Sequence, residues 1–307
     1  MTRETIPESD PLLKAASEAV TSAINTKFPL DNLLGPELSR LISVSNSVVK
    51  RHGLLLERAI ITALEASGRF QVLHNPVIPI TAAADSLVAS NSPETLARVA
   101  LRYDTPAVRS VTHDIVVIDT QSAWAGAYQV KRGGGDMGPR LRKPLERDLA
   151  AVRLLLRSYL RDQGYSAVDV VTTAAIDWLG AAGLPDHLTI MGSELDEHFG
   201  VPVVPTIERM TVALRAALHS AVPELLEPLL AALELQARTL SELARPAGKA
   251  RAVKESSAEE DLIGMPDFLN NLVEFPARPV GPGPRRAPLD SLVVPRPPER
   301  PAGSARR

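Results

Sequence analysis

The 307-residue sequence contains no cysteine, and this absence excludes several chemistries at once. Disulfide frameworks, thiolate nucleophiles, zinc fingers and iron–sulfur clusters all need that side chain, and its absence fits a reducing cytoplasm. An excess of one charge is also missing, since 34 basic and 36 acidic side chains give a formal net charge of −2. A histone-like protein and a wholly acidic solvating tail are excluded, so any affinity for nucleic acid or membrane has to come from local patches.

Targeting and membrane signals are missing as well. Instead of the basic-then-apolar pattern of a signal peptide, residues 1–20 carry four acids, namely Glu4, Glu8, Asp10 and Glu18. No uncharged apolar run reaches the roughly 18 residues of a membrane span. We therefore expect a soluble, cytoplasmic protein, in which 45% hydrophobic residues build the core of one large domain or two modest ones.

Several catalytic motifs are absent too. The six histidines form no HExxH or HxxxH pair, which gives a zinc hydrolase little support. No GxSxG elbow is present for a serine hydrolase. The glycines at 133–135 lack the GK[ST] ending of a phosphate-binding loop, so nucleotide hydrolysis is not supported. These glycines instead let the chain leave the preceding strand flexibly or approach a ligand closely.

Composition divides the chain into four regions. An N-terminal helical region is followed by a core, a C-terminal helical layer or dimerisation segment, and a Pro/Arg-rich, largely disordered tail, at 1–47, 48–205, 206–245 and 246–307. From 276 to 307 the tail has nine prolines, seven arginines and two acids, a net charge of +5, and too little apolar surface to offset the entropy of ordering. The apolar island at 261–275 is expected to dock on the body or on a partner protein.

The apolar spacing predicts a mixed α/β architecture. Helical spacing extends to Ser67, and a further helix is expected with Ser92 as its N-cap. Two β-rich runs at 111–119 and 125–131 predict a hairpin. The other expected elements are an extended stretch at 70–80, helices at 85–99 and 141–161, strands at 167–174 and 188–191, and a helix at 207–243 interrupted at Pro223 and Pro228.

The predicted hairpin is the most informative part of the sequence. Side chains of a strand alternate between its faces, so Gln129 and Lys131 point one way while Tyr128 and Val130 point the other. Asp114 begins the first strand, and pairing across the turn brings its carboxylate beside Gln129. We therefore expect an acid, an amide oxygen and a lysine on one surface.

These groups have the ligand chemistry of a hard divalent cation. Mg²⁺ prefers carboxylate, amide, backbone carbonyl and water oxygens, which Asp114, Gln129 and the Val130 carbonyl supply. We expect Mg²⁺, with Mn²⁺ as an alternative. Lys131 would orient or help to deprotonate a metal-bound water, or offset charge on a phosphorus-centred transition state. Taken singly, Lys131 also fits an ordinary strand-end cation, and Asp114 a hydrogen-bonding acid.

Positive charge accumulates after the hairpin. Between residues 131 and 161 there are nine basic residues and three acids, a local charge of +6 on a body that is otherwise acidic. Cations oppose the dipole at a helix start unless an anion lies nearby, so a phosphate backbone fits here. We expect double-stranded DNA to contact Lys131, Arg132, Arg140, Arg142, Lys143 and Arg147. The alternative is a solvated basic face paired with Glu146 and Asp148.

The combined pattern resembles the PD-(D/E)xK nuclease superfamily, the restriction-endonuclease-like fold. A helical Glu, a strand-initial Asp, an x-(D/E/Q)-x-K run and a basic helix correspond here to Glu57 in GLLLERAI, Asp114 in THDIVVID, and Gln129 and Lys131 in AYQVKRG. The resemblance covers residues 48–205 and implies a mixed central sheet flanked by helices, with Mg²⁺-dependent hydrolysis of phosphodiesters. It also implies that Glu57 serves a second metal or lies just outside the ligands of the first.

The sequence departs from the family pattern at two positions. His113 stands in place of the Pro that names the motif. Gln129 stands where an acid is usual, which removes one ligand charge, and some methylation-dependent restriction enzymes and junction resolvases of the superfamily look similar in this respect. Glu57 also fits the solvated stripe of an amphipathic helix. Asp119 and Asp136 are further acids near the hairpin that could replace Asp114 or assist a second metal.

The resemblance implies a metal-dependent DNA endonuclease, first a type II restriction enzyme, because no helicase or methyltransferase motif is visible. We expect a homodimer, since the leucine-rich segment at 207–243 is more apolar than one surface stripe needs. A repair or resolvase-type nuclease is one alternative. Another is a catalytically inactive DNA-binding or assembly module whose tail recruits a protein partner. The least favoured alternative is a purely structural helical adaptor.

Overall fold

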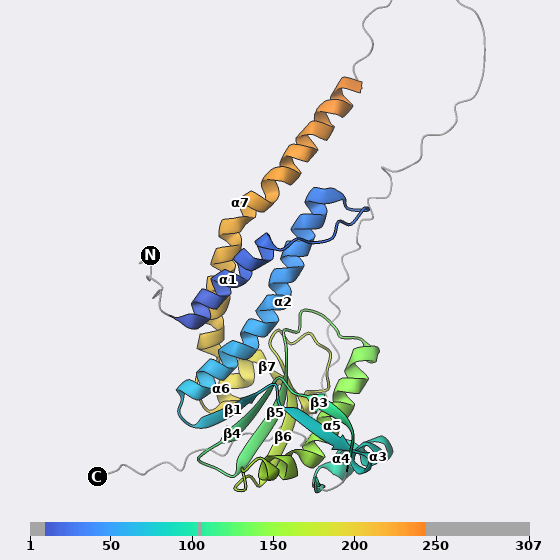
Figure 1. Ribbon diagram of the computed structural model, residues 1–307, viewed down its shortest axis with the longest axis vertical. Helices are drawn as coiled ribbons and strands as arrows, with labels where there is room; N and C mark the ends of the chain where they lie inside the picture. Colours follow the sequence, from blue (N-terminus) through green and yellow to red (C-terminus); the bar gives the residue numbers. More distant parts are fainter. Residues whose placement is uncertain (1–9, 104–105, 244–307) are drawn as a thin grey trace, which may run out of the picture. The chain divides into compact units, whose positions relative to one another are not determined.

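The computed structural model describes residues 10–103 and 106–243, and within these ranges the protein is a mixed α/β structure, as the sequence predicted. A five-stranded sheet has the order β1-β4-β5-β6-β7 and lies between helices (Figure 1). Its strands are β1 (Phe70–His74), β4 (Ile115–Asp119), β5 (Trp124–Lys131), β6 (Val170–Asp177) and β7 (Thr189–Met191). A smaller sheet pairs β2 (Val77–Thr81) with β3 (Ala107–Thr112).

The large sheet is mixed in direction. Strands β1, β4 and β5 are antiparallel neighbours, whereas β5, β6 and β7 run parallel. The predicted hairpin is confirmed, since β4 pairs with β5 and Ile115 lies opposite Tyr128. All five residues of β4 are buried because helices and the small sheet cover both faces.

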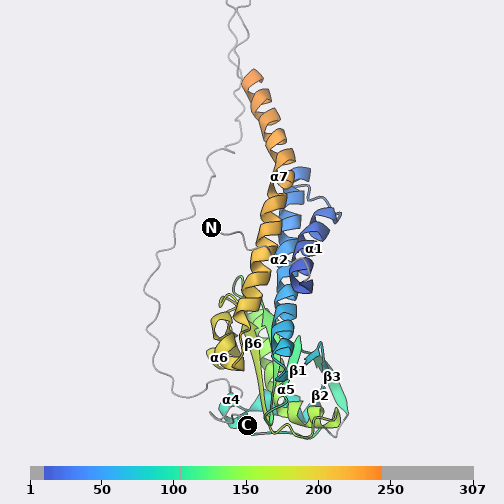
Figure 2. The ribbon, with the colours of Figure 1, turned by 90° about the vertical axis from the view of Figure 1, so that its left-hand side faces the viewer.

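Two groups of helices cover the two faces. On one face Ile115, Val117 and Tyr128 pack with α1 (Pro11–Asn25), α2 (Gly35–Ala66), α6 (Leu195–Phe199) and the first part of α7 (Val204–Leu243). On the other, Val116 and Ala127 pack with α3 (Ala82–Ser90), α4 (Pro93–Leu96) and α5 (Pro139–Asp162). Figure 2 shows α1 and the first part of α7 running along α2. The short 3₁₀ turns η1 (Asp186–Leu188) and η2 (Gly192–Glu194) flank β7.

Local sequence explains where most elements begin. Pro139 occupies the first turn of α5, where its missing N–H costs no hydrogen bond, and Gly138 supplies the preceding positive φ of 70°. The predicted cap at Ser92 is confirmed, because its Oγ accepts from the Thr95 N–H at 3.5 Å. The cap starts the short α4, so the helix expected at 85–99 is in fact two helices.

Two expectations about regular structure were wrong. Val111 and Thr112 belong to β3, which was not anticipated as a separate strand. Helix α7 is continuous through Pro223 and Pro228 instead of being interrupted there. Each proline removes one helical hydrogen bond, but the surrounding leucine, alanine and glutamate residues are strong helix formers and the helix continues.

Helix α7 passes from one unit of the chain into a second, which begins at Ala232 and is described only as far as residue 243. By length and composition alone, the stretch Val204–Ser241 is the one helix of the described ranges that could cross a membrane. Four leucines along α7 are exposed, namely Leu230, Leu233, Leu235 and Leu240. The cellular location stays a prediction, and the tail at 246–307 with its island at 261–275 lies outside the described residues.

Candidate functional site

The candidate site lies where β4 begins and β5 ends. Asp114 directly precedes β4, and its Oδ2 accepts a hydrogen bond of 2.5 Å from the Val130 N–H. The ammonium of Lys131 is 3.8 Å from the same oxygen. Both side chains are partly exposed, at 20% for Asp114 and 31% for Lys131, so water and a ligand can reach them. The hairpin therefore brings the acid and the lysine together.

The Gln129 side chain donates one hydrogen bond and accepts another. Its Nε2 donates to the Thr112 carbonyl of β3 at 2.6 Å, and its Oε1 accepts from Lys131 Nζ at 3.0 Å. The backbone of β3 thus fixes the orientation of the amide and directs its oxygen toward the lysine. A carboxylate at this position would oppose the Thr112 carbonyl oxygen, because a carboxylate has no proton to donate.

Glu57 reaches the same region from α2. Its side chain is half-buried on a helix whose core face is formed by neighbours such as Leu56 and Ile60. Burial raises the pKa of Glu57 to about 7, with a further contribution from the charge of Asp114 and an opposing one from Lys131. Asp114 and Lys131 lie close enough to Glu57 for their charges to act on it, and Glu57 is half-buried, unlike an acid on a solvated helical stripe.

Nearby positive groups do not fully offset the effect of burial on the pKa of Asp114. Burial raises the pKa of Asp114, although Lys131, the Val130 N–H and His74 all act in the opposite direction. A raised pKa in a carboxyl group close to a cation is typical of functional positions, where charge is held ready for a ligand. The contribution of His74 also identifies a neighbour that sequence reasoning missed.

The turn between β1 and β2 lies against the segment that carries Asp114. The Asn75 N–H donates to the Asp114 carbonyl at 3.0 Å, and the His113 N–H donates to the Pro76 carbonyl at 3.1 Å. His74 and Asn75 are exposed there. Nothing in the local sequence indicated this contact, because it depends on the pairing of β1 with β4, about 40 residues further along the chain.

His113, which directly precedes Asp114, is buried. Burial and the charge of Lys131 lower the pKa of His113 to about 4, so its ring is neutral at ordinary pH. Neither ring nitrogen has a hydrogen-bond partner in the part of the chain that the structure describes. His113 therefore contributes a neutral, buried ring next to Asp114 in the chain.

Arg132, one of the residues expected to contact DNA, links three elements. Its Nε donates to His52 Nδ1 of α2 at 3.1 Å, and His52 Nε2 lies 3.2 Å from Thr211 Oγ1 of α7. Burial, with a smaller contribution from Arg132, lowers the pKa of His52. The neutral imidazole can accept from the arginine, so this contact fixes the end of β5 against α2.

The glycine-rich turn after β5 has a structural cause. Asp177, at the end of β6, accepts from the Gly180 and Ala182 N–H groups at 3.0 and 2.8 Å. A Cβ on Gly133 would stand 1.6 Å from Asp177 Oδ1, and Gly133 has a φ of +69°. Gly133 therefore permits the close approach of two turns beside Lys131, which is the approach of backbone to a carboxylate and not to a ligand.

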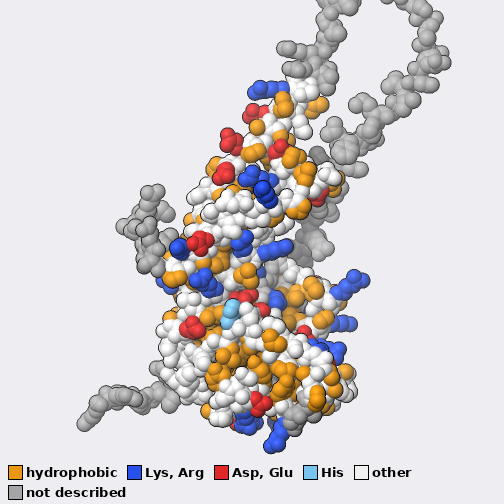
Figure 3. Space-filling model, in the orientation of Figure 1, with side chains coloured by type: hydrophobic (Ala, Val, Ile, Leu, Met, Phe, Trp, Pro, Cys, Tyr) orange, Lys and Arg blue, Asp and Glu red, His pale blue; other side chains and the backbone are white. Residues whose placement is uncertain are grey.

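The basic residues at the start of α5 fall into two groups. Arg147 lies 3.1 Å from Asp85, and Arg142 donates to the Gly183 carbonyl at 2.9 Å and lies 3.9 Å from Asp136. Arg140 and Lys143 are exposed, and neither forms an ion pair within the described residues. Figure 3 shows Lys and Arg side chains along the side of the molecule where α5 lies.

The two further acids near the hairpin have partners of their own. Asp119 stands at the opposite end of β4, where its Oδ2 accepts from Arg69 Nη2 at 2.7 Å and from Ser122 Oγ at 2.8 Å. Its carboxylate is fully buried. Asp136 is exposed and accepts from the Gly138 N–H of the glycine-rich turn. The proximity of Asp119 to the hairpin in the sequence was misleading.

The residues present fit a hard cation in part. Asp114 and Glu57 offer carboxylates and Gln129 an amide oxygen, whereas no group of three His, Cys, Asp or Glu side chains suited to a metal occurs in the described part of the chain. The Val130 N–H faces Asp114, and in a strand the carbonyl of the same residue points to the same side. Two acids, one amide and one carbonyl thus suit Mg²⁺, with water completing the coordination.

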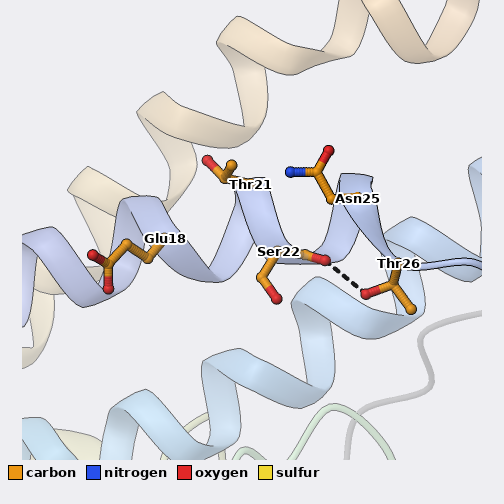
Figure 4. Close-up of a pocket in the computed structure, with 5 residues that line it drawn as sticks. All are labelled: Glu18, Thr21, Ser22, Asn25 and Thr26. Atoms are coloured by element: carbon orange, nitrogen blue, oxygen red, sulfur yellow. Dashed lines mark hydrogen bonds between the residues drawn. The ribbon is translucent and has the colours of Figure 1, made fainter.

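A hollow on α1 offers a contrast. It is lined by Glu18, Thr21, Ser22, Asn25 and Thr26 (Figure 4). Thr26 Oγ1 donates to the Ser22 carbonyl at 2.6 Å, and Glu18 is the one titratable residue among those that line the hollow. A single exposed acid provides no pair of groups for acid–base work, so the hairpin is the better candidate.

Comparison with family models, curated proteins and solved structures found no match to this chain.

Proposed function

We propose that this protein is a Mg²⁺-dependent DNA endonuclease with a restriction-endonuclease-like fold. The observation that carries the proposal is the convergence of Glu57, Asp114 and Lys131 from three separate segments. Asp114 and Lys131 lie 3.8 Å apart, and both act on the pKa of Glu57. The five-stranded mixed sheet flanked by helices supports the fold assignment.

Asp114, Glu57, the Gln129 amide oxygen and the Val130 carbonyl would hold the ion. When bound, Mg²⁺ would supply electrophilic stabilisation of the phosphoryl oxygens and a more acidic water. Lys131 would orient the attacking water and offset negative charge as the phosphorus–oxygen bond to the leaving sugar breaks. Without a metal the pKa of Glu57 is raised to about 7, and the charge of a bound cation would lower it and keep this ligand ionised.

One observation favours the second candidate, an inactive DNA-binding or assembly module. Gln129 supplies no charge, and its Oε1 is engaged with Lys131 Nζ at 3.0 Å. In this alternative the amide and the lysine form a closed contact that a metal or a water does not enter. A restriction enzyme and a repair or resolvase-type nuclease share the same proposed chemistry, and a homodimer is proposed for each.

The decisive experiment compares the wild type with Lys131→Ala on mixed phage and plasmid DNA in Mg²⁺, Mn²⁺ or EDTA. The matched control is Lys14→Ala, because Lys14 is an exposed lysine on α1. We expect metal-dependent cleavage by the wild type and the control, and a loss on the order of 100-fold or more in Lys131→Ala. Discrete bands would identify a site-specific enzyme, and a smear a nonspecific or repair nuclease.

Intact DNA under all three conditions would contradict the endonuclease proposal. A salt-dependent mobility shift without cleavage would then support the binding module, since contacts with phosphates release counterions. Circular dichroism of each variant should match the wild type, which excludes loss of folding as the cause of lost activity.

A further inference from the structure

We propose that His74 and Asn75 form a phosphate-binding subsite, whose side chains donate hydrogen bonds to oxygens of the DNA phosphodiester beside Asp114. The inference rests on the proposed nuclease function and adds a substrate contact to the same site. Neither residue belongs to the pattern on which that function rests. The argument combines the strand order, the shape of the turn and the exposure of its side chains.

The order of the sheet puts donors on both sides of Asp114. Strand β4 lies between β1 and β5, so Lys131 flanks the acid from β5 and His74 flanks it from β1. His74 is the last residue of β1 and pairs with Ile115, the first residue of β4. A phosphate that contacts Lys131 on one side of Asp114 could therefore meet a second set of donors on the other side, at the end of β1.

Two backbone hydrogen bonds fix the turn in this position. Asn75 N–H donates to the Asp114 carbonyl, and His113 N–H donates to the Pro76 carbonyl. Because the bonds run in both directions between the two segments, the turn cannot move without the segment that carries Asp114. The side chains of His74 and Asn75 are thus held in register with the acid.

The backbone of Asn75 is held in an uncommon conformation. Its φ of 50° is the one positive φ of a non-glycine residue in the described ranges. Asn tolerates the left-handed region better than most residues, but a residue that precedes proline, as Asn75 precedes Pro76, normally adopts an extended conformation. Such strain persists where surrounding contacts enforce it, and residues of this kind cluster at functional sites.

The two side chains can offer hydrogen-bond donors to a ligand. Asn75 Nδ2 lies 3.2 Å from His74 Nε2, and because the amide nitrogen only donates, the ring nitrogen accepts. The remaining ring proton of a neutral His74 is then on Nδ1. That proton and the second amide hydrogen of Asn75 are free to donate to a phosphate oxygen, as both side chains are exposed.

The negative charge of the site explains why a phosphate would need these donors. Asp114 and Glu57 bring two carboxyl groups to a place where a phosphodiester is to bind, and the guanidinium of Arg132 is engaged with His52. Lys131 alone leaves the approaching phosphate with few partners on the β1 side. Donors on that side reduce repulsion between substrate and carboxylates and orient the phosphate across Asp114.

The test uses four variants of the full chain. His74→Ala removes the ring, and His74→Gln retains a donor. Asn75→Gly removes the amide but keeps the positive φ available, whereas Asn75→Ala removes the amide and disfavours that φ. The control is His219→Ala, since His219 is an exposed histidine on α7.

Each protein is assayed for the kcat and KM of cleavage of a plasmid that the wild type cuts, and for binding of a fluorescent duplex of the same sequence in EDTA. We expect His74→Ala to raise KM and the dissociation constant about 10-fold, with a smaller change in kcat. His74→Gln should recover part of the loss, and Asn75→Gly should weaken binding several-fold. Circular dichroism and urea unfolding separate these effects from misfolding, which we expect only in Asn75→Ala.

Different failures of this experiment have different meanings. Unchanged KM and dissociation constant in His74→Ala and Asn75→Gly, with an active wild type, would overturn the subsite and leave the nuclease proposal intact. A wild type that binds the duplex but never cleaves it would overturn the nuclease, and the binding assay would still decide on the subsite. A wild type that neither binds nor cleaves DNA would overturn both.

Discussion

The two ends of strand β4 each carry an aspartate, and the two differ in almost every physical respect. Asp119 is fully buried and accepts hydrogen bonds from Arg69, Ser122 and the Gln121 N–H. Asp114 is partly exposed, with one backbone donor and a lysine at 3.8 Å. An acid with every oxygen satisfied supports the fold, whereas an acid with capacity left over can serve a ligand.

The pKa values of the two acids shift in opposite directions. Burial acts to raise the pKa of Asp119, but Arg69, the Gln121 N–H and Ser122 together outweigh it and the pKa is lowered. At Asp114 burial dominates over Lys131, Val130 and His74, and the pKa is raised. Folding therefore stabilises the charge of one carboxylate and penalises the charge of the other.

The largest expected effect is on stability at the Asp119 end. Asp119→Ala leaves the guanidinium of Arg69, only 8% exposed, without its carboxylate. We expect the free energy of unfolding to fall by about 3–5 kcal/mol, because a buried guanidinium loses the carboxylate that balances its charge. Urea unfolding measures the change, and the variant should still bind DNA at low temperature while folded. If the free energy of unfolding falls by less than about 1 kcal/mol, Asp119 is not the structural acid that we contrast with Asp114.

The Asp114 end should respond in activity instead. Asp114→Asn keeps an acceptor for the Val130 N–H but removes the charge, so we expect cleavage to fall on the order of 100-fold. Stability should be unchanged or higher by about 0.5–1 kcal/mol, since a penalised charge is gone. The same urea measurement serves as the check. Destabilisation similar to that of Asp119→Ala would make Asp114 a structural acid.

A smaller effect is expected in the pH dependence of stability, measured in EDTA. The pKa of Glu57 is raised to about 7 in the folded protein, above the 4.5 of an unperturbed glutamate. Between these two values the folded state binds a proton that the unfolded chain has released, so stability falls as pH rises through this window. Glu57→Gln should abolish a decrease on the order of 1 kcal/mol, because partial exposure screens the charge.

The Glu57 experiment has a clear opposite outcome. If wild type and Glu57→Gln lose stability in parallel between pH 5 and pH 8, the pKa of Glu57 is not raised, and the electrostatic support for its place beside Asp114 and Lys131 is lost. Asp119, whose pKa is lowered, has the reverse dependence: its contribution is present above the pKa of the unfolded carboxyl and is lost as pH falls through the lower folded value.

Short-range features of the site were accessible to sequence reasoning. The alternation of side chains in 125–131 and a short turn are enough to bring Asp114 and Lys131 together, because both depend on local pairing. The long helix at 139–162 follows from its own amphipathic spacing and from Pro139 at its start. In both cases the information lies within about 20 residues of the element that it determines.

Long-range features were not accessible. The contact of Asn75 with Asp114 and the bond between Arg132 and His52, which lie 80 residues apart in the sequence, both depend on how distant elements pack. The role of Asp119 was misjudged for the same reason, since Arg69 is 50 residues away. Periodicity predicts which face of an element is buried, but it does not identify the partner that meets it.

The hydrogen bond from Gln129 to Thr112 limits which amino acids can replace Gln129. Its acceptor is a main-chain carbonyl at 2.6 Å, which no replacement of the Thr112 side chain can take away. An acid could enter position 129 only if β3 moved, and β3 is paired with β2 along its length. The number of negative charges at this edge of the sheet therefore depends on the position of the small sheet, because a carboxylate at position 129 would face a fixed carbonyl oxygen.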